Sequence, residues 1–177
     1  MATSDLATAM QRAARVLQRR PATGIHDDAP ATAHWQAGTR VVASHANGTQ
    51  VLTDMPGELG GGGDQVTPGW LFRASLASCL ATRIAMGAAA EGIELGRLEV
   101  LASSRSDTRG LLGMTDAAGA PVSAEPSDVH LRVRIAAPGV PPQRLRTLVE
   151  DSHRHSPIPA AVEHAVPVDL RIDIDAS

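Results

Sequence analysis

Apolar positions follow a helical spacing at the N-terminus of the chain. A helix is predicted to begin at Ser4 or Asp5, either of which suits an N-cap, and to end before Pro21. The apolar residues on one face of this helix are Leu6, Met10, Ala13, Val16 and Leu17. Residues 21–31 contain Pro, Gly and Asp and predict a linker.

Short strand patterns follow the linker. The segments TAHWQ, TRVVAS and TQVLTD predict three strands, and Asn47-Gly48 between the last two is a strong hairpin signal because the turn needs positive φ angles. The stretch PGELGGGGDQV, residues 56–66, predicts a glycine-rich loop. It lacks the G-x-x-x-x-G-K-[ST] pattern of a phosphate-binding loop, so that function is not expected.

A long helix is predicted next. Thr67 is a good N-cap, Pro68 suits the first helical turn, and Gly92 after Glu91 is a natural stop. Further along the chain, the patterns predict strands over residues 95–104, 128–137 and 166–175, helices over 141–155 and 156–165, and an irregular segment over 105–127. The last two strands alternate apolar and polar residues.

This order of elements predicts an α+β fold, in which antiparallel hairpins are segregated from helices. The chain has 177 residues, of which 43% are hydrophobic, so one domain with a real core is expected. Only 2% of the residues are aromatic, namely Trp35, Trp70 and Phe72. Because aliphatic side chains bury less area than aromatic rings, a core shared in a dimer would help.

Charge and cysteine content narrow the function classes. The net charge is −3, and the sixteen basic residues are all arginines that form no cluster, so nucleic acid is not an expected partner. One cysteine cannot form an intramolecular disulfide, which suits the reducing cytoplasm. No signal-peptide pattern or membrane-spanning stretch is found. The N-terminal helix is Arg-rich like a mitochondrial presequence, but Asp5 favours an ordinary helix.

The only cysteine, Cys79, lies in the middle of the predicted long helix. The residues that share its helical face are Ser75, Leu76, Thr82, Arg83 and Met86. Because helical side chains lean toward the N-terminus, Arg83 is expected to reach back over Cys79, where its charge would favour the nucleophilic thiolate. These residues alone leave another interpretation open, since a free cysteine is more often a small buried apolar residue.

A longer stretch carries a family resemblance. The segment LGGGGDQVTPGWLFRASLASCLATRIAMGAAAEGIELGRLEV resembles the region around the first active-site cysteine of the OsmC/Ohr family, which comprises osmotically inducible protein C and organic hydroperoxide resistance protein. DTRGLLGM, VRIAAPGVPPQRLRTLVEDSHRHSPI and VPVDLRIDI resemble later family elements in the same order. The resemblance divides the chain into an N-terminal helix and linker, residues 1–31, and an OsmC-like domain, residues 32–177.

The resemblance implies an intertwined homodimer, with antiparallel sheets around a long central helix and two equivalent sites at the subunit interface. Family members reduce organic hydroperoxides, and Cys79 matches their peroxidatic cysteine. In the family a second cysteine resolves the sulfenic acid, and a glutamate at the helix start orients an arginine from an early strand. Here Ser156 and Gly69 occupy those two positions, and Arg40 is the candidate arginine.

These departures shape the functional hypothesis. A sulfenic acid on Cys79 would need an external thiol for its reduction. Without the glutamate that orients the family's arginine, Arg83 or Arg73 is expected to supply the positive charge near the thiol. The leading prediction is a one-cysteine peroxidase for small organic hydroperoxides, without cofactor or metal. The alternative is a non-catalytic OsmC-like protein that binds a small apolar ligand at the dimer interface.

Two further groups of residues are candidates for a site. His153, His155 and His164 lie around the second active-site segment and could ligate zinc or supply a base, although solvated histidines near helix ends are more common. Glu58 could replace the missing carboxylate, although a surface-loop carboxylate without a role is more common.

Overall fold

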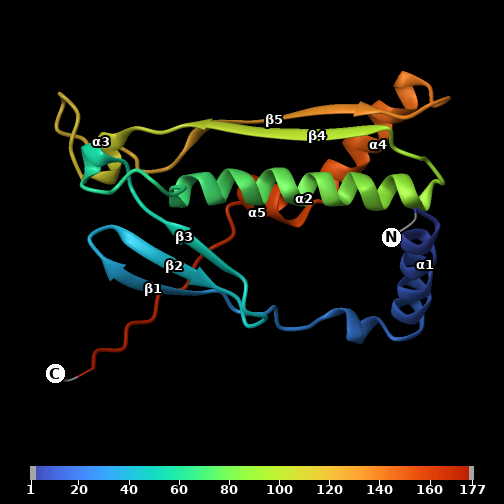
Figure 1. The fold of residues 1–177 in the computed structure, drawn as a ribbon, viewed down its shortest axis with the longest axis horizontal. Helices are drawn as coiled ribbons and strands as arrows, with labels where there is room; N and C mark the ends of the chain where they lie inside the picture. The colour runs from blue at the N-terminus through green and yellow to red at the C-terminus, as the bar shows by residue number, and fades with distance from the viewer. Residues whose placement is uncertain (1–2, 176–177) are drawn as a thin grey trace.

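The computed structural model describes residues 3–175 and confirms an α+β fold built around one long helix (Figure 1). One antiparallel sheet has the strand order β1-β2-β3, and a second pairs β4 with β5. The strands are β1 (Thr32–Ala37), β2 (Arg40–Ser44), β3 (Gln50–Thr53), β4 (Arg97–Arg105) and β5 (Ser127–Ala136). The helices are α1 (Thr3–Arg19), α2 (Pro68–Ala90), α3 (Thr108–Leu111), α4 (Pro142–Arg154) and α5 (Pro157–Glu163). Short 3-10 turns span Pro21–Gly24 and Gly57–Leu59.

Helix α2 begins and ends at the predicted residues. The hydroxyl oxygen of Thr67 accepts a hydrogen bond from the backbone N–H of Trp70 at 3.2 Å, and proline occupies the first turn. At the other end Glu91 is the C-cap, and Gly92 adopts a φ of 68°, in the left-handed region that favours glycine. The boundaries of the cysteine-bearing helix are therefore encoded by its local sequence.

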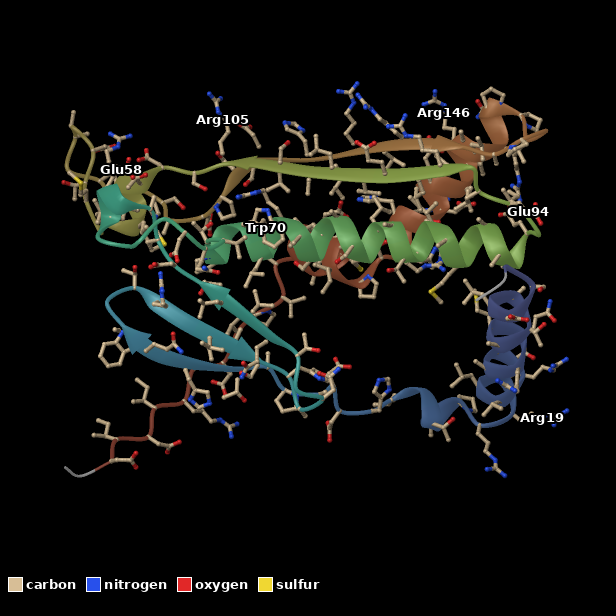
Figure 2. All side chains as sticks on the ribbon, viewed as in Figure 1. Arg19, Glu58, Trp70, Glu94, Arg105 and Arg146 are labelled. Atoms are coloured by element: carbon tan, nitrogen blue, oxygen red, sulfur yellow. The ribbon has the colours of Figure 1, made fainter. Side chains whose placement is uncertain are left out.

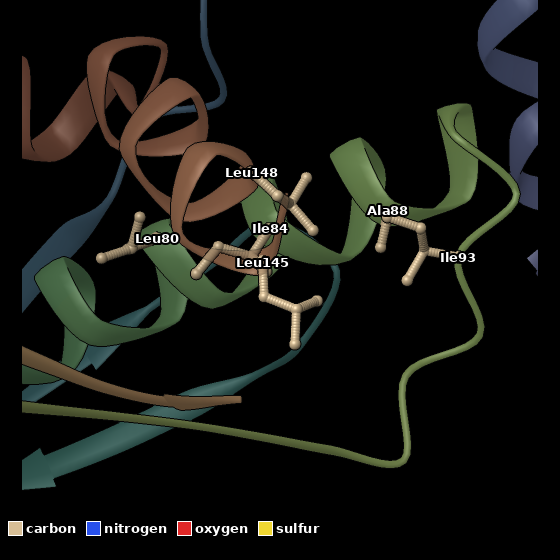
Figure 3. Close-up of a cluster of buried hydrophobic side chains, with 6 residues drawn as sticks. All are labelled: Leu80, Ile84, Ala88, Ile93, Leu145 and Leu148. Carbon is tan, nitrogen blue, oxygen red and sulfur yellow. The ribbon is translucent and has the colours of Figure 1, made fainter. Parts of the chain in front are cut away.

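The hydrophobic core lies between α2, α4 and the inner face of the β4–β5 sheet. Its six buried members are Leu80, Ile84, Ala88, Ile93, Leu145 and Leu148 (Figure 3). Alternate residues of the two paired strands, such as Val100 of β4 and Val133 of β5, pack against this cluster. The cluster is aliphatic throughout, as the low aromatic content predicted.

Helices α2 and α4 approach closely at Gly87. A Cβ atom added to Gly87 would lie 2.8 Å from Leu148 Cδ1 and 3.2 Å from Ser152 Oγ. Ser152 is itself buried, and its hydroxyl donates a hydrogen bond to the main-chain carbonyl of Arg83 at 3.4 Å. These contacts hold α4, and the junction that leads into α5, against the C-terminal half of α2.

Two local expectations need correction. Residues 45–49 connect β2 to β3. Gly48 has a positive φ of 92°, and the side chain of Asn47 accepts a hydrogen bond from the backbone N–H of Thr49. The turn is therefore longer than a two-residue hairpin.

In α1, which packs against α2 (Figure 1), Val16 and Leu17 of the predicted apolar face remain exposed.

The predicted final strand does not form within the single chain. Residues 166–175 belong to neither sheet, and in Figure 1 they leave α5 on the side of α2 opposite the β4–β5 sheet. Their apolar side chains are strongly exposed: Val168 by 93%, Leu170 by 79%, Ile172 by 72% and Ile174 by 89%. A strand needs a neighbour for its backbone N–H and C=O groups, and the described chain offers this segment none.

The chain exposes far more surface than a compact monomer. Its accessible area is 13037 Å², whereas a compact protein of 18.4 kDa would expose about 8,200 Å². Besides the C-terminal segment, all six residues of β1 are exposed, including Trp35 by 72%. Large exposed apolar side chains that lie together in this way are typical of interaction surfaces.

The contact at Gly87 gives a first prediction. Substitution Gly87→Val will destabilise the fold by about 1–3 kcal/mol, because the added methyl groups meet Leu148 and Ser152 in a packed core. Ala90→Val, at an exposed position of the same helix, will cost only about 0.5 kcal/mol of helix propensity. Urea denaturation of both variants measures the difference, and equal midpoints would contradict the close α2–α4 approach.

Candidate active site

Cys79 lies half-buried in a groove between α2 and the α4–α5 junction. The groove has a volume of about 490 Å³. Its lining residues are Ser75, Ser78, Cys79, Thr82, Arg83 and Met86 from α2, and His155, Pro157 and Ile158 from the junction. The predicted helical face therefore lines the groove, except for Leu76, which is 2% exposed and lies with the core. Cys79 is thus not a fully buried apolar residue.

Arg83 and His155 bring polar groups into the same groove. His155 Nδ1 lies 2.8 Å from the main-chain carbonyl oxygen of Asp151. Because a carbonyl oxygen only accepts, this contact places the proton of the neutral ring on Nδ1 and leaves Nε2 able to accept a proton. The groove therefore combines a thiol, a guanidinium group and an imidazole. Helical spacing predicted that Cys79 and Arg83 share a face, and His155 was one of the three histidines named as candidates from the sequence. Pro157 and Ile158 were not predicted.

Ser156 stands in the fully buried N-cap position of α5. It is 0% exposed, and its hydroxyl donates a hydrogen bond to the carbonyl oxygen of Ser152 at 2.9 Å. Its neighbours His155 and Pro157 line the Cys79 groove, but Ser156 itself does not. The position that holds a second cysteine in the resemblance therefore adjoins the groove and carries a hydroxyl that is already engaged.

The structure places Arg40 in a different cluster. Its Nη2 atom lies 3.1 Å from Asp54 Oδ2 and also pairs with Asp64 in the glycine-rich loop. Asp54 is buried and accepts hydrogen bonds from the hydroxyl of Thr39 at 2.6 Å and the backbone N–H of Gly62 at 2.9 Å. These bonds hold the pKa of Asp54 well below its usual range. Arg40 does not line the Cys79 groove of its own chain.

The start of α2 lacks a carboxylate, although the backbone at Gly69 would accept a Cβ atom without a clash. A Cβ atom at Gly69 would meet Arg73 Nη1 at 3.7 Å and Thr67 Oγ1 at 3.8 Å, which are ordinary contacts. Arg73 donates a hydrogen bond to Ser104 Oγ of β4 at 3.3 Å and does not line the groove. Glu58 is exposed on its 3-10 turn (Figure 2) and also lies outside the groove lining. Of the two arginines expected to compensate for the missing glutamate, Arg83 is the one that lines the groove with Cys79.

The three histidines do not gather around a common point. His153 Nε2 pairs with Glu163 Oε1 at 3.3 Å, and His164 Nδ1 lies 2.8 Å from the carbonyl oxygen of Ala160 in its own helix. Among residues 3–175, no group of three or more His, Cys, Asp or Glu side chains is arranged to hold a metal ion.

A comparison with known proteins assigns the chain to a family. Residues 61–171 match the family model described as OsmC-like protein, so the chain belongs to the OsmC-like family. A comparison with curated protein sequences gave no match. In the part of the chain that the structure describes, no helix is long and apolar enough to cross a membrane.

Several solved structures share the fold. An OsmC-like protein from Mycoplasma pneumoniae is similar with a TM-score of 0.64 and 14% identity, covering 78% of this chain and 89% of that one. The organic hydroperoxide resistance protein OsmC from Legionella pneumophila gives 0.57 and 20%, covering 78% and 90%. An organic hydroperoxide resistance protein from Elizabethkingia anophelis, with thiocyanate bound, gives 0.55 and 21%, covering 78% and 89%.

The buried carboxylate at Arg40 gives a second prediction. Because its pKa is lowered in the folded state, Asp54 contributes stability that is complete above its unfolded pKa of about 3.8 and is lost as the pH falls toward the folded value. Substitution Asp54→Asn will therefore destabilise the protein most at pH 7 and by a smaller amount at pH 3, where the carboxyl group of the unfolded chain is already largely protonated. Denaturation of both proteins at the two pH values measures this, and a pH-independent difference would exclude the charged form as the cause.

Proposed function

We propose that the protein is a one-cysteine thiol peroxidase that reduces small organic hydroperoxides in oxidative stress defence. The observation that carries this proposal is the placement of the Cys79 thiol in an open groove with Arg83 and His155. Family membership supports it, because similar folds belong to organic hydroperoxide resistance proteins of Legionella pneumophila and Elizabethkingia anophelis.

The proposed reaction begins with the Cys79 thiolate. The guanidinium of Arg83 stabilises its negative charge, and His155 Nε2 accepts the thiol proton. The thiolate attacks the distal peroxide oxygen, so that an S–O bond forms and the O–O bond breaks. The leaving alkoxide takes a proton and departs as an alcohol, which leaves Cys79 as a sulfenic acid. Apolar groups of Met86, Pro157 and Ile158 line the groove for the organic part of the substrate.

The second half of the cycle needs a thiol from outside the chain. Ser156 offers a hydroxyl, which cannot form a disulfide with the sulfenic acid. An external thiol attacks the oxidised sulfur and releases water, which gives a mixed disulfide. A second external thiol then displaces Cys79, so two thiols become one disulfide and the reduced enzyme is restored.

We also propose that the working form is a homodimer. The excess of accessible surface over that of a compact monomer supports it, since obligate homodimers bury about 2,000–5,000 Å². Arg40 lies outside the groove of its own chain, so a direct catalytic role for Arg40 requires the groove of a second copy.

Peroxide treatment tests the proposed function. With a modest excess of cumene hydroperoxide, the protein will gain one oxygen atom at Cys79, because the sulfur atom is accessible in the groove. The sulfenic acid is trapped with a dimedone reagent and located by intact-mass and peptide mass spectrometry. Cys79→Ser is the matched control and will show no adduct.

The opposite result would favour the other candidate role. The groove surface is largely apolar and includes Met86, Pro157 and Ile158, which suits a small apolar ligand as well as an apolar peroxide. If Cys79 stays reduced under these conditions while an apolar fluorescent probe binds the groove, the protein is a non-catalytic ligand-binding member of the family.

The role of Arg83 gives a separate prediction. Substitution Arg83→Ala will slow the oxidation of Cys79 at neutral pH by about three- to tenfold, because the thiolate loses its nearby positive charge. Arg73→Ala is the matched control on the same helix, since Arg73 hydrogen-bonds to Ser104 of β4 instead of lining the groove. Stopped-flow rates of both variants measure the effect, and equal rates would remove Arg83 from the mechanism.

A further inference from the structure

Helix α1 stands partly clear of the rest of the fold. It packs against α2, and Leu6 and Met10 in its first half are half-buried, whereas residues 11–31 are exposed throughout. In Figure 1, α1 runs from the C-terminal end of α2 away from the β4–β5 sheet. The helix also lies outside residues 61–171, which match the family. Neither the core nor the family match therefore accounts for the second half of α1.

Three arginines surround one apolar residue on this exposed half. Val16 lies four residues after Arg12, three before Arg19 and four before Arg20, and residues at these spacings are neighbours on a helix surface. Arg20 follows the last helical residue, and its backbone N–H still donates a hydrogen bond to the carbonyl oxygen of Val16 at 2.9 Å. The helical fold therefore gathers charges that are spread out in the linear sequence.

The chain itself does not neutralise the positive charge of these arginines. No Asp or Glu occurs between Leu6 and His26. The ion pairs formed within residues 3–175 use other arginines, such as Arg40 and Arg144. The whole chain nonetheless has a net charge of −3, so the rest of the molecule is acidic. The second half of α1 is thus a basic end on an acidic protein.

Exposed apolar side chains lie beside these charges. Val16 is 49% exposed, Leu17 42% and Ile25 87%. The 3-10 turn Pro21–Gly24 folds back toward α1, since a Cβ atom added to Gly24 would lie 3.2 Å from Leu17 Cδ2. Ile25 directly follows this turn, so the three apolar side chains lie near the same end of the helix. Together with the three arginines they form the α1 surface, which comprises Arg12, Val16, Leu17, Arg19, Arg20 and Ile25.

We propose that the α1 surface docks onto an anionic lipid surface. Its three guanidinium groups bind lipid phosphates, because anionic headgroups attract basic side chains at short range. Its three apolar side chains enter the boundary between the headgroups and the acyl chains. This role goes beyond the proposed peroxidase function and does not involve the thiol of Cys79.

The combination of charged and apolar side chains favours lipid over other occupants. A nucleic acid would use the arginines, but α1 has no aromatic residue on which bases could stack, and its exposed aliphatic side chains would stay in water. A second copy that docked through the same face would bring like charges together across a two-fold axis. A lipid surface accommodates both kinds of side chain, as it does for basic amphipathic helices that lie in the membrane interface.

The location of the α1 surface allows a flat partner to reach it. Figure 2 shows Arg19 at the end of α1 remote from α2, on the periphery of the molecule. An anionic surface attracts this end and repels the acidic remainder of the chain, so the molecule is oriented as it approaches.

Vesicle sedimentation tests the docking. The full chain will pellet with vesicles of equal parts phosphatidylglycerol and phosphatidylcholine, and it will stay in solution with vesicles of phosphatidylcholine alone. Each arginine near an anionic surface strengthens binding about fivefold, so the triple variant Arg12→Gln, Arg19→Gln, Arg20→Gln will bind at least about tenfold more weakly. Val16→Asn with Ile25→Asn keeps the charge and will also weaken binding, because it removes the apolar contact.

A matched variant removes the same amount of charge elsewhere. Arg105, Arg132 and Arg146 are exposed on β4, β5 and α4. The triple variant that replaces these three arginines with glutamine will bind the anionic vesicles as the unmodified chain does. Circular dichroism of both triple variants will match that of the unmodified chain, since all the replaced side chains are exposed.

Several results would overturn the proposal. They are failure of the full chain to pellet with anionic vesicles, equal binding by the two triple variants, and equal binding to both vesicle compositions. A changed oligomeric state of the α1 variant with unaltered vesicle binding would instead assign the surface to a second copy. Cys79→Ser will bind vesicles as the unmodified chain does, so the outcome is separate from the peroxide test of Cys79.

Discussion

The burial of α2 is the constraint on which the rest of the structure depends. This helix is apolar on nearly all sides, and Arg73 and Arg83 are its only charged residues. Such a helix must be covered on several faces at once. The β4–β5 sheet, α4 with α5, and α1 each cover part of it. Arg73 donates a hydrogen bond to Ser104 of β4, whereas Arg83 lines the groove that these elements leave uncovered.

Most of the elements could be predicted because their signals are local. Thr67 caps the start of α2 through its side chain, and Gly92 after the C-cap ends the helix through its left-handed backbone; both depend on only a few neighbouring residues. The alternation in β5 likewise follows from one buried face. The segment 166–175 carries an equally clear alternation but remains unpaired, since a strand pattern specifies a face and does not specify a neighbour.

The candidate site was predictable in part. Helical spacing correctly predicted that Arg83 and Cys79 share one face of α2. The same spacing also included Leu76, which lies in the core, because the part of α2 that lines the groove is narrower than the predicted face. The contribution of Pro157 and Ile158 depends on how closely α4 packs on α2, which a linear pattern does not contain. Arg40 shows the same limit: its residue type fits catalysis, but its contacts are with Asp54 and Asp64.

The exposed segment 166–175 has a consequence for how the molecule is made. In the proposed homodimer a second chain covers exposed apolar surface such as this segment, and that contact forms in a bimolecular step whose rate rises with protein concentration. The resistance of the protein to heat would likewise rise with concentration. Newly synthesised chains would then pass through a stage in which the apolar side chains of residues 166–175 are exposed, and the abundance of the protein would govern how long that stage lasts.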